Sequence, residues 1–287
     1  MKNVIILFLT GTVLCCLQTP LMAQSFKEHI SKEFALPNES SGSTLFIYNI
    51  DGFIKVEGYD GNKVLLEMDK TISADDNQTL ENGKKEFKLG FDQKADSIIA
   101  YIAEPFDSRP CHNRNCNECK KIEYQYQVNF TVKVPFSMNL NISTVNNGII
   151  TVSDVSGTLH INNVNAGITI TNAKGTTYAH TVNGDISIYY VSNPTEQSSY
   201  YTINGNIKVS YRSDLSADLQ FKSMNGEFFT DFPDAELLPM SPTKNKENKN
   251  GGTVYKINKT TAVRFGKGGK VFNFETLNGN VYIKKQS

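Results

Sequence analysis

The feature that most constrains this chain is a nine-residue repeat between Thr144 and Ile188. Five consecutive blocks follow one template, in which a small residue is followed two and four positions later by mostly apolar residues. The small residues are Gly148, Gly157, Ala166, Gly175 and Gly184. Apolar residues two apart are typical of a β-strand with one buried face. Each block therefore predicts one short strand and one turn.

Two kinds of block alternate along the repeat. Asn147, Asn165 and Asn183 precede the small residue in three blocks, whereas Ser156 and Lys174 do so in the blocks between them. The structural unit is therefore two blocks, or 18 residues. Short repeats that cannot bury a face alone must stack on one another, which predicts an all-β β-solenoid with two short strands per rung. The alternative is a series of antiparallel hairpins with Asn-Gly turns, which would not require this regularity.

Further copies of the turn lie outside the regular blocks. Asn204-Gly205, Asn225-Gly226 and Asn278-Gly279 continue the pattern with rungs of about 21 residues, and Asp51-Gly52 is an early copy. Glycine tolerates positive φ, so we expect it at the turns for that reason. The predicted turn glycines are Gly52, Gly148, Gly157, Gly175, Gly184, Gly205, Gly226 and Gly279. We also expect the corner asparagines to hydrogen-bond along the stack: Asn146, Asn165, Asn183, Asn204, Asn225 and Asn278.

At this point the chain resembles a known family. The run Val132-Lys133-Val134-Pro135, followed by Leu140 and the glycine blocks, is similar to the bacterial putative-adhesin domain family of unknown function, which is common in Bacteroidetes. The resemblance covers residues 44–66 and 128–287. It implies an exported protein with a β-solenoid-like fold. Its motif is structural, so it implies no catalytic residues.

The N-terminus has the pattern of a signal peptide. Lys2 precedes a largely apolar run from Val4 to Leu17, and Leu21-Met22-Ala23 ends in a small residue before Gln24. The run is shorter than the roughly 20 residues that a membrane-spanning helix needs. We therefore expect an exported mature chain, periplasmic, cell-surface or secreted, without a transmembrane segment. Its net charge of zero gives no basic excess for nucleic acid.

The rest of the chain divides into four regions. Residues 24–43 are expected to form a polar leader or a short helix, because Phe26, Ile30 and Phe34 have helical spacing. Residues 44–135 predict a β-rich N-terminal region that forms an antiparallel flap or cap over the first rung. It includes a cysteine-containing hairpin loop, residues 104–121. Residues 136–287 predict the solenoid, with an inserted loop at residues 232–261.

The cysteine loop is the strongest local irregularity. Cys111, Cys116 and Cys119 are the cysteines of the expected mature chain. Export favours a local disulfide between two of them, with one thiol left over. A zinc site with His112 as fourth ligand is the alternative, but two adjacent ligands fit one tetrahedral ion poorly. An iron–sulfur cluster would need a fourth cysteine. We expect no metal and no cofactor.

Stacking also predicts which outward side chains share a row. Asp185, Asn206, Glu227 and Asn280 follow the turn glycines, which places Asp185 and Glu227 about 10 Å apart. That separation is close to the wide end of inverting glycosidase geometry, but no further acid, Arg or His joins the pair. On the opposite face, stacking predicts a row of His160, Tyr178, Ser199 and Gln220, which lacks the Asp that would orient a Ser–His pair.

The remaining outward row predicts a flat β-surface that ends in aromatic side chains: Thr151, Thr169, Ser187, Lys208, Phe229 and Tyr282. Lys208, Phe229 and Tyr282 are the candidate binding residues. The leading hypothesis is therefore a non-catalytic, adhesin-like β-solenoid that binds an unknown protein or glycan or serves as an envelope scaffold. The alternatives are a glycan-active enzyme on one solenoid face and a metal- or redox-responsive envelope protein acting through the Cys111–Cys119 loop.

Overall fold

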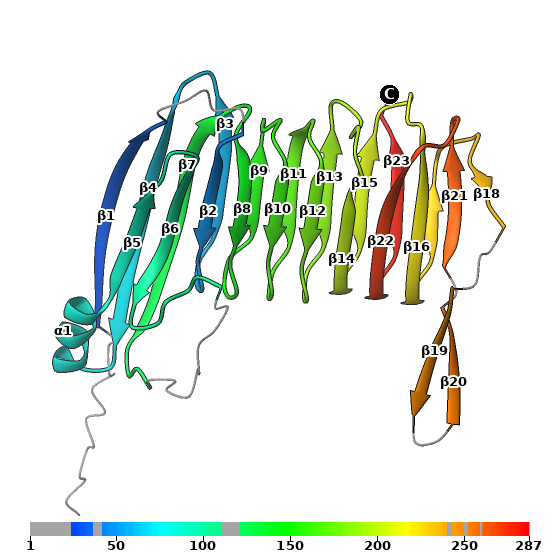
Figure 1. The fold of residues 1–287 in the computed structure, drawn as a ribbon. Coiled ribbons are helices and arrows are strands. Elements are labelled where there is room, and N and C mark those ends of the chain that lie inside the picture. The colour runs from blue at the N-terminus through cyan, green and yellow to red at the C-terminus, as the bar shows by residue number, and fades with distance from the viewer. Residues whose placement is uncertain are drawn as a thin grey trace, which may run out of the picture.

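A computed structural model describes residues 24–36, 42–110, 121–239, 243–249, 252–258 and 260–286, with only the backbone given between 243 and 258. The predicted signal peptide, residues 1–23, and the cysteine cluster, residues 111–119, lie outside the described residues. The chain forms two long β-sheets that face each other, joined rung by rung at their corners (Figure 1). The predicted all-β solenoid is confirmed.

The ten-stranded sheet is called sheet A. Its spatial order is β1 (Gln24–Ala35), β4 (Lys63–Ala74), β7 (Gln125–Pro135), β3 (Ile54–Tyr59), β9 (Ile150–Ser153), β11 (Ile168–Ala173), β13 (Ile186–Tyr190), β15 (Ile207–Tyr211), β23 (Val281–Lys285) and β17 (Phe228–Thr230). From β3 onward its strands are parallel, as rungs that coil in one direction require.

The eleven-stranded sheet is called sheet B. Its spatial order is β18 (Glu236–Leu237), β21 (Thr261–Phe265), β16 (Ala217–Asn225), β22 (Lys270–Asn278), β14 (Ser199–Asn204), β12 (Thr177–His180), β10 (Leu159–Asn162), β8 (Asn139–Ser143), β2 (Thr44–Tyr48), β6 (Ser97–Glu104) and β5 (Lys88–Gln93). The one helix among the described residues, α1 (Asn77–Glu86), packs on β4 and β1 at the N-terminal end.

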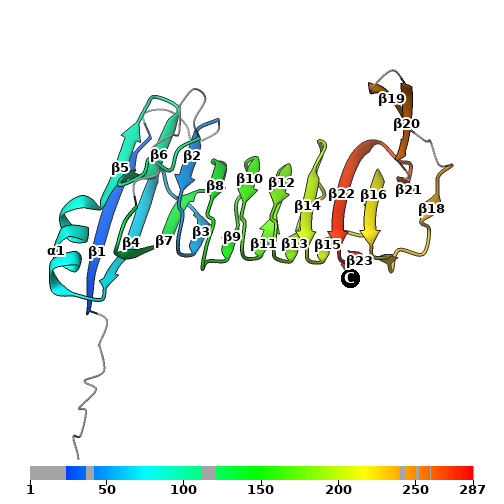
Figure 2. The same ribbon diagram turned by 90° about the horizontal axis from the view of Figure 1, so that it is seen from below.

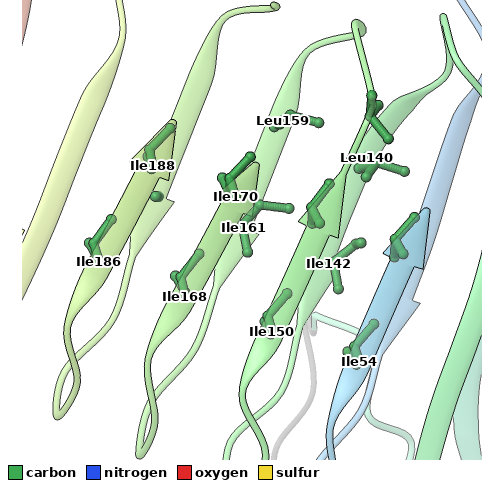
Figure 3. Packing of buried hydrophobic residues seen from close by; sticks show 14 of the residues in the cluster. Ile54, Leu140, Ile142, Ile150, Leu159, Ile161, Ile168, Ile170, Ile186 and Ile188 are labelled. Carbon is green, nitrogen blue, oxygen red and sulfur yellow. The ribbon is translucent and has the colours of Figure 1, made fainter. Parts of the chain in front are cut away.

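The core lies between the two sheets and is made of the predicted alternating residues. Ile150, Ile168 and Ile186 occupy one row across three neighbouring strands, and all three are fully buried (Figure 3). Each such side chain contributes about 1.5–3 kcal/mol relative to an exposed position. Three tyrosines are also fully buried, and their hydroxyls bond in series, Tyr190 to Tyr200 at 2.9 Å and Tyr200 to Tyr211 at 3.0 Å.

The apolar residue directly before each asparagine of the predicted corner row is not part of this core. Val182 is partly exposed, whereas Thr181 beside it is fully buried. The inward phase of β12 continues through Thr181, so Val182 turns outward at the corner. The same residue in the other rungs forms a partly exposed apolar row along the molecule: Val145, Val164, Val182, Ile203, Leu277 and Met224.

The rungs do not stack in chain order at the C-terminal end. The final rung, β22 with β23, lies between the β14–β15 rung and the β16–β17 rung in both sheets. The chain reaches this place from β21, which pairs antiparallel with the other side of β16, through a turn at residues 266–269. The sequential order expected from the repeat is therefore wrong after β15.

The N-terminal region caps the solenoid in part as expected. β1, β4 and β7 form an antiparallel extension of sheet A, which Figure 1 shows as the longest strands of the molecule. The polar leader predicted for residues 24–43 is wrong for Gln24–Ala35, which form β1. Phe26, Ile30 and Phe34 also share one face of a strand. The charged residues between them are accommodated on that face, because Glu28 pairs with Lys70 and Lys32 lies over the Phe91 ring.

Two predicted loops also differ from expectation. Residues 104–121 do not close a hairpin, because β6 pairs in sheet B and β7 pairs in sheet A; the segment connects the two sheets instead. The insertion at 232–261 is not only a loop. It contains β18 and the antiparallel β19 (Thr243–Lys249) and β20 (Gly252–Asn258), a hairpin that projects from the solenoid (Figures 1 and 2). Backbone pairing forms this hairpin despite its polar, charged composition.

Candidate functional surfaces

The corner asparagines form a continuous ladder, as predicted. Each side-chain amide donates from Nδ2 to Oδ1 of the asparagine in the preceding rung, over distances of 2.7–3.0 Å. The spatial order is Asn146, Asn165, Asn183, Asn204, Asn278 and Asn225, so the ladder follows the interleaved rungs rather than the chain. Amide side chains used in this way stabilise the stack.

A second ladder lies inside the same corner and was not predicted. The Thr202 hydroxyl donates to the carbonyl oxygen of Gly184 in the preceding rung at 2.9 Å, and Thr276 donates to Gly205 at 3.1 Å. Thr144, Thr181 and Ser223 make the equivalent bond. The signal was present in the sequence, because a hydroxyl residue stands three positions before the turn glycine in rung after rung. These bonds satisfy turn carbonyl groups that would otherwise lie in the solenoid corner without a hydrogen-bond donor from a side chain.

The turn glycines are required for close stacking rather than for backbone angle. Of the eight predicted turn glycines only Gly52 has a positive φ, of 114°. A Cβ at Gly205 would lie 2.1 Å from the Gly184 carbonyl oxygen, and one at Gly279 would lie 1.9 Å from the Gly205 oxygen. Each turn therefore rests directly on the backbone of the turn before it. The positive φ values expected of glycine occur instead at Asn147, Asp154 and Asn172.

The two acidic residues of the outward corner row, Asp185 and Glu227, do not lie close together. Asn206 and Asn280 both separate Asp185 from Glu227 along the stack, because the C-terminal rung is interleaved. Three rung steps place the two carboxylates about 14 Å apart rather than the expected 10 Å. Asp185 Oδ1 also accepts the backbone N–H of Asn206 at 2.7 Å. This row is therefore a third ladder.

The three candidate binding residues of sheet A lie side by side. The Lys208, Tyr282 and Phe229 positions are consecutive in register across β15, β23 and β17. The Phe229 and Tyr282 rings stack with centroids 5.1 Å apart and planes 10° apart, and Lys208 Nζ is 5.9 Å from the Tyr282 centroid. The Tyr282 hydroxyl accepts from Asn280 Nδ2 at 3.1 Å. Phe229 is 40% exposed, so the stacked pair presents a ring to solvent.

The predicted row on sheet B is also present, with one addition. His160, Tyr178 and Ser199 are consecutive in register, and Asn273 lies between Ser199 and Gln220. The His160 and Tyr178 rings stack at 4.5 Å with planes 11° apart. Partial burial lowers the pKa of His160. His180 and Tyr201 form a second aromatic pair beside the first, at 4.6 Å, which sequence reasoning missed.

A separate cavity of about 560 Å³ opens at the junction of the cap and the first rung. Its lining includes Asp51, Asn147, Tyr124 and Tyr126. Asn147 Nδ2 donates to Asp51 Oδ2 at 2.8 Å. Burial raises the pKa of Tyr124 and of Tyr126 to about 12, so both hydroxyls are neutral at physiological pH. Among the described side chains that line it, Asp51 supplies the only carboxylate.

The predicted disulfide and the alternative zinc site both belong to the cysteine loop. Cys111, Cys116, Cys119 and His112 lie outside the described residues. Among the residues that are described, no three His, Cys, Asp or Glu side chains converge closely enough to hold a metal ion. Within that same part of the chain, no helix is long and apolar enough to cross a bilayer.

Comparison with known proteins gives one family match. Residues 135–261 match the model of the Toastrack DUF4097 family, which confirms the resemblance inferred from the repeat. The matched range ends before the interleaved C-terminal rung. No curated protein matches the chain.

The solved structures that match the chain are distant in sequence. A putative cell adhesion protein from Clostridium sporogenes has 11% identity and a TM-score of 0.41, and the match covers 91% of this chain and 100% of that one. A putative adhesin from Bacteroides fragilis has 9% identity and a TM-score of 0.29, with 90% and 97% covered. A putative lipid binding protein from Parabacteroides distasonis has 8% identity and a TM-score of 0.22, with 90% and 97% covered.

Proposed function

We propose that this protein is an exported, non-catalytic, adhesin-like scaffold that binds its ligand on the outer faces of the solenoid. The observation that carries the proposal is the outward-facing row of Lys208, Tyr282 and Phe229 on sheet A, in which Phe229 is 40% exposed. Stacked aromatic rings supply a large contact area with little loss of side-chain entropy, and a nearby cation adds polar recognition. Aromatic residues are enriched at the buried centres of protein interfaces.

The rest of the solenoid supports a binding role through its rigidity. The asparagine and threonine ladders fix each corner to the next, and the outward side chains stand on a continuous sheet. A surface that is ordered before binding loses less conformational entropy when a ligand docks on it. The most frequent polar residues of the repeat are therefore assigned to the scaffold, and the outer faces are assigned to recognition.

The glycan-active alternative has less support. Asp185 and Glu227, the carboxylates that prompted it, lie three rungs apart, and Asp185 accepts a backbone hydrogen bond. Two carboxylates that act on one glycosidic bond need a separation of roughly 5–9.5 Å. The metal- or redox-responsive alternative depends on Cys111, Cys116 and Cys119, and the described residues provide no observation that favours it.

The binding role can be tested with beads that carry the purified protein. Retention is measured on immobilised mucin, collagen and peptidoglycan sacculi, for the native chain and for the double variant Phe229→Ala/Tyr282→Ala. We expect retention on at least one surface and a loss of about tenfold in the variant, since aromatic anchors dominate interface energetics. The matched control is Thr169→Ala/Ser187→Ala, which alters two short side chains in the same row of sheet A.

Two results would contradict the proposal. One is the absence of retention on all three surfaces. The other is release of reducing sugar ends from mucin or sacculi by the purified protein, which would make it a glycan-active enzyme. Export is tested separately by the intact mass of protein recovered from the cell envelope and medium, which should correspond to a chain that begins at Gln24.

A further inference from the structure

The outer face of sheet B is uncharged over five consecutive strands. From β2 through β8, β10 and β12 to β14, the outward positions alternate with fully buried ones such as Leu45, Leu140 and Leu159. The outward side chains of this face are aromatic, amide or hydroxyl groups: Phe46, Tyr48, Asn141, Ser143, His160, Asn162, Tyr178, His180, Ser199 and Tyr201. No Asp, Glu, Lys or Arg is among them. This set is called the sheet B face.

The sheet B face has two parallel rows. One row runs Phe46, Asn141, His160, Tyr178 and Ser199, and the other runs Tyr48, Ser143, Asn162, His180 and Tyr201. Each row therefore contains rings and hydrogen-bonding groups in neighbouring strands. Burial by neighbouring rings lowers the pKa of both His160 and His180, so both imidazoles are neutral at physiological pH.

Ion pairs border the sheet B face at both ends. Toward the cap, Arg109 lies 3.9 Å over the Tyr101 ring and pairs with Asp92 and Asp107. Toward the C-terminal rung, Lys222 pairs with Glu275, whose position follows Tyr201 in register. The charges at these borders are paired with one another. The ten side chains of the sheet B face between them thus carry no net charge at physiological pH.

We propose that the sheet B face binds a neutral polysaccharide chain, which lies along the rows and across the strands. The inference rests on the proposed binding role but assigns it to a second face and names the class of ligand. A sugar ring has an apolar side that stacks on aromatic faces and a rim of hydroxyls that bond to amides and hydroxyls. An anionic or cationic polymer would find no counter-charge here, and binding would desolvate its own charges without compensation.

The geometry suits an extended chain rather than a single sugar. Five strands at a spacing of about 4.8 Å give a face about 19 Å long, which several sugar units span. The His160–Tyr178 pair at 4.5 Å and the His180–Tyr201 pair at 4.6 Å lie on β10, β12 and β14, near the C-terminal half of the face. Tyr178 is the tyrosine of its row and stacks on His160, so it is the residue on which binding depends most.

The test is affinity electrophoresis of the full chain in native gels. The gels contain dextran, laminarin or galactomannan as neutral probes and alginate or heparin as anionic probes. We expect retardation by at least one neutral polysaccharide, an apparent Kd raised at least about tenfold by Tyr178→Ala, and a change within about twofold for Tyr178→Phe. Tyr189→Ala, which removes a half-exposed tyrosine from β13 of sheet A, is the matched control and is expected to bind as the native chain does.

Three results would overturn the inference: no retardation by any neutral polysaccharide, stronger retardation by the anionic probes, or native-like binding by Tyr178→Ala. Circular dichroism establishes that the variants are folded. If Tyr178→Ala is unfolded, His180→Ala and Tyr201→Ala on the same face replace it, with the same expected loss. One combination of results separates the two proposals. If no neutral polysaccharide is bound, but retention of the protein-coated beads still depends on Phe229 and Tyr282, the inference about the sheet B face is wrong and the proposed function stands.

Discussion

The rungs up to β15 and the rungs after it are built from the same repeat but are arranged differently. From β8 to β15, each rung stacks on the one before it in the chain. After β15 the final rung, β22–β23, takes the next place, and the β16–β17 rung is displaced to the end. The asparagine ladder nevertheless continues without a gap from Asn204 through Asn278 to Asn225. Matching side chains, rather than chain order, therefore define a rung's place.

The inward side chains favour the final rung for the inner place, because Ile283 and Phe272 stand in register with Thr230 and Leu219 of the β16–β17 rung. Phe272, Phe274, Val281 and Ile283 are at most 2% exposed. In the β16–β17 rung, by contrast, Phe228 is only partly buried, and the residues after Phe221 in β16 are exposed. An inner rung has neighbours on both sides, so the more apolar segment gains more from it. The displaced rung forms the end of the stack, where it is covered in sheet B by β21 and β18.

The largest expected effect comes from a substitution at the boundary between the two regions. Gly205→Ala places a Cβ 2.1 Å from a backbone oxygen in a rung held from both sides, so we expect a loss of roughly 3 kcal/mol in unfolding free energy. Gly226→Ala at the end rung meets a similar contact at 1.8 Å, but that rung has no further rung beyond it and can shift. Its cost is expected to be clearly smaller, as measured by urea unfolding.

A control for this comparison exists in the same column. Ala166 already carries a Cβ at the position equivalent to Gly184, so Ala166→Gly is expected to change the unfolding free energy by no more than about 1 kcal/mol. Equal losses for Gly205→Ala and Gly226→Ala would mean that both rungs are equally confined, contrary to the interleaved order.

The buried hydroxyl ladder predicts a smaller difference. Thr202→Val leaves the Gly184 carbonyl oxygen without its donor inside the stack, which we expect to cost about 1–2 kcal/mol. Ser223→Ala removes the equivalent bond at the end rung, where the serine is exposed and the bond is 3.3 Å long, and is expected to cost less than about 0.5 kcal/mol. Urea unfolding of both variants measures the difference. Comparable losses would show that the hydroxyls contribute equally in both places.

The exposed asparagine ladder predicts a smaller difference again. Asn204 both donates to Asn183 and accepts from Asn278, whereas Asn225 at the end of the ladder only donates. We expect Asn204→Ala to cost about 1 kcal/mol and Asn225→Ala about half of that, because exposed hydrogen bonds compete with water. The shift in thermal midpoint checks this order, and a larger shift for Asn225→Ala would contradict it.

The smallest effect is expected at the opposite end of the molecule, where β1 is attached by charges. His29 contacts Asp69 at 2.8 Å and Glu67 at 2.9 Å, and these hydrogen bonds raise its pKa. A raised folded-state pKa stabilises the fold fully below the ordinary value of about 6.5 and loses that stabilisation as pH rises through the raised value. The difference in thermal midpoint between the native chain and His29→Gln should therefore shrink from pH 5.5 to pH 9. A difference that grows with pH would contradict this assignment.

Much of the solenoid was predictable because its repeat is local and exact in spacing. The nine-residue period by itself places Gly148 with Gly184, and Asn165 with Asn183, in columns. The threonine ladder had an equally regular signal, but Thr181 lies next to the apolar Val182, and an apolar residue is the more usual candidate for burial.

The order of the last rungs was not predictable from the repeat. Asn225-Gly226 and Asn278-Gly279 fit the same template, so local pattern cannot say which of them follows Asn204-Gly205 in space. The choice depends on packing against both neighbours, which is a long-range property. β1 was missed for a related reason, since the spacing of Phe26, Ile30 and Phe34 fits both a helix and one face of a strand.

The interleaved order, on which the row of Lys208, Tyr282 and Phe229 depends, is tested most directly by amide hydrogen exchange of the purified protein. Peptides from β22 and β23 are compared with peptides from β16 and β17. An inner rung has hydrogen-bonded neighbours on both sides, so β22–β23 is expected to exchange as slowly as β14–β15, and β17 at the sheet edge is expected to exchange fastest. Slow exchange in β17 together with fast exchange in β23 would mean that the rungs stack in chain order and would contradict this account.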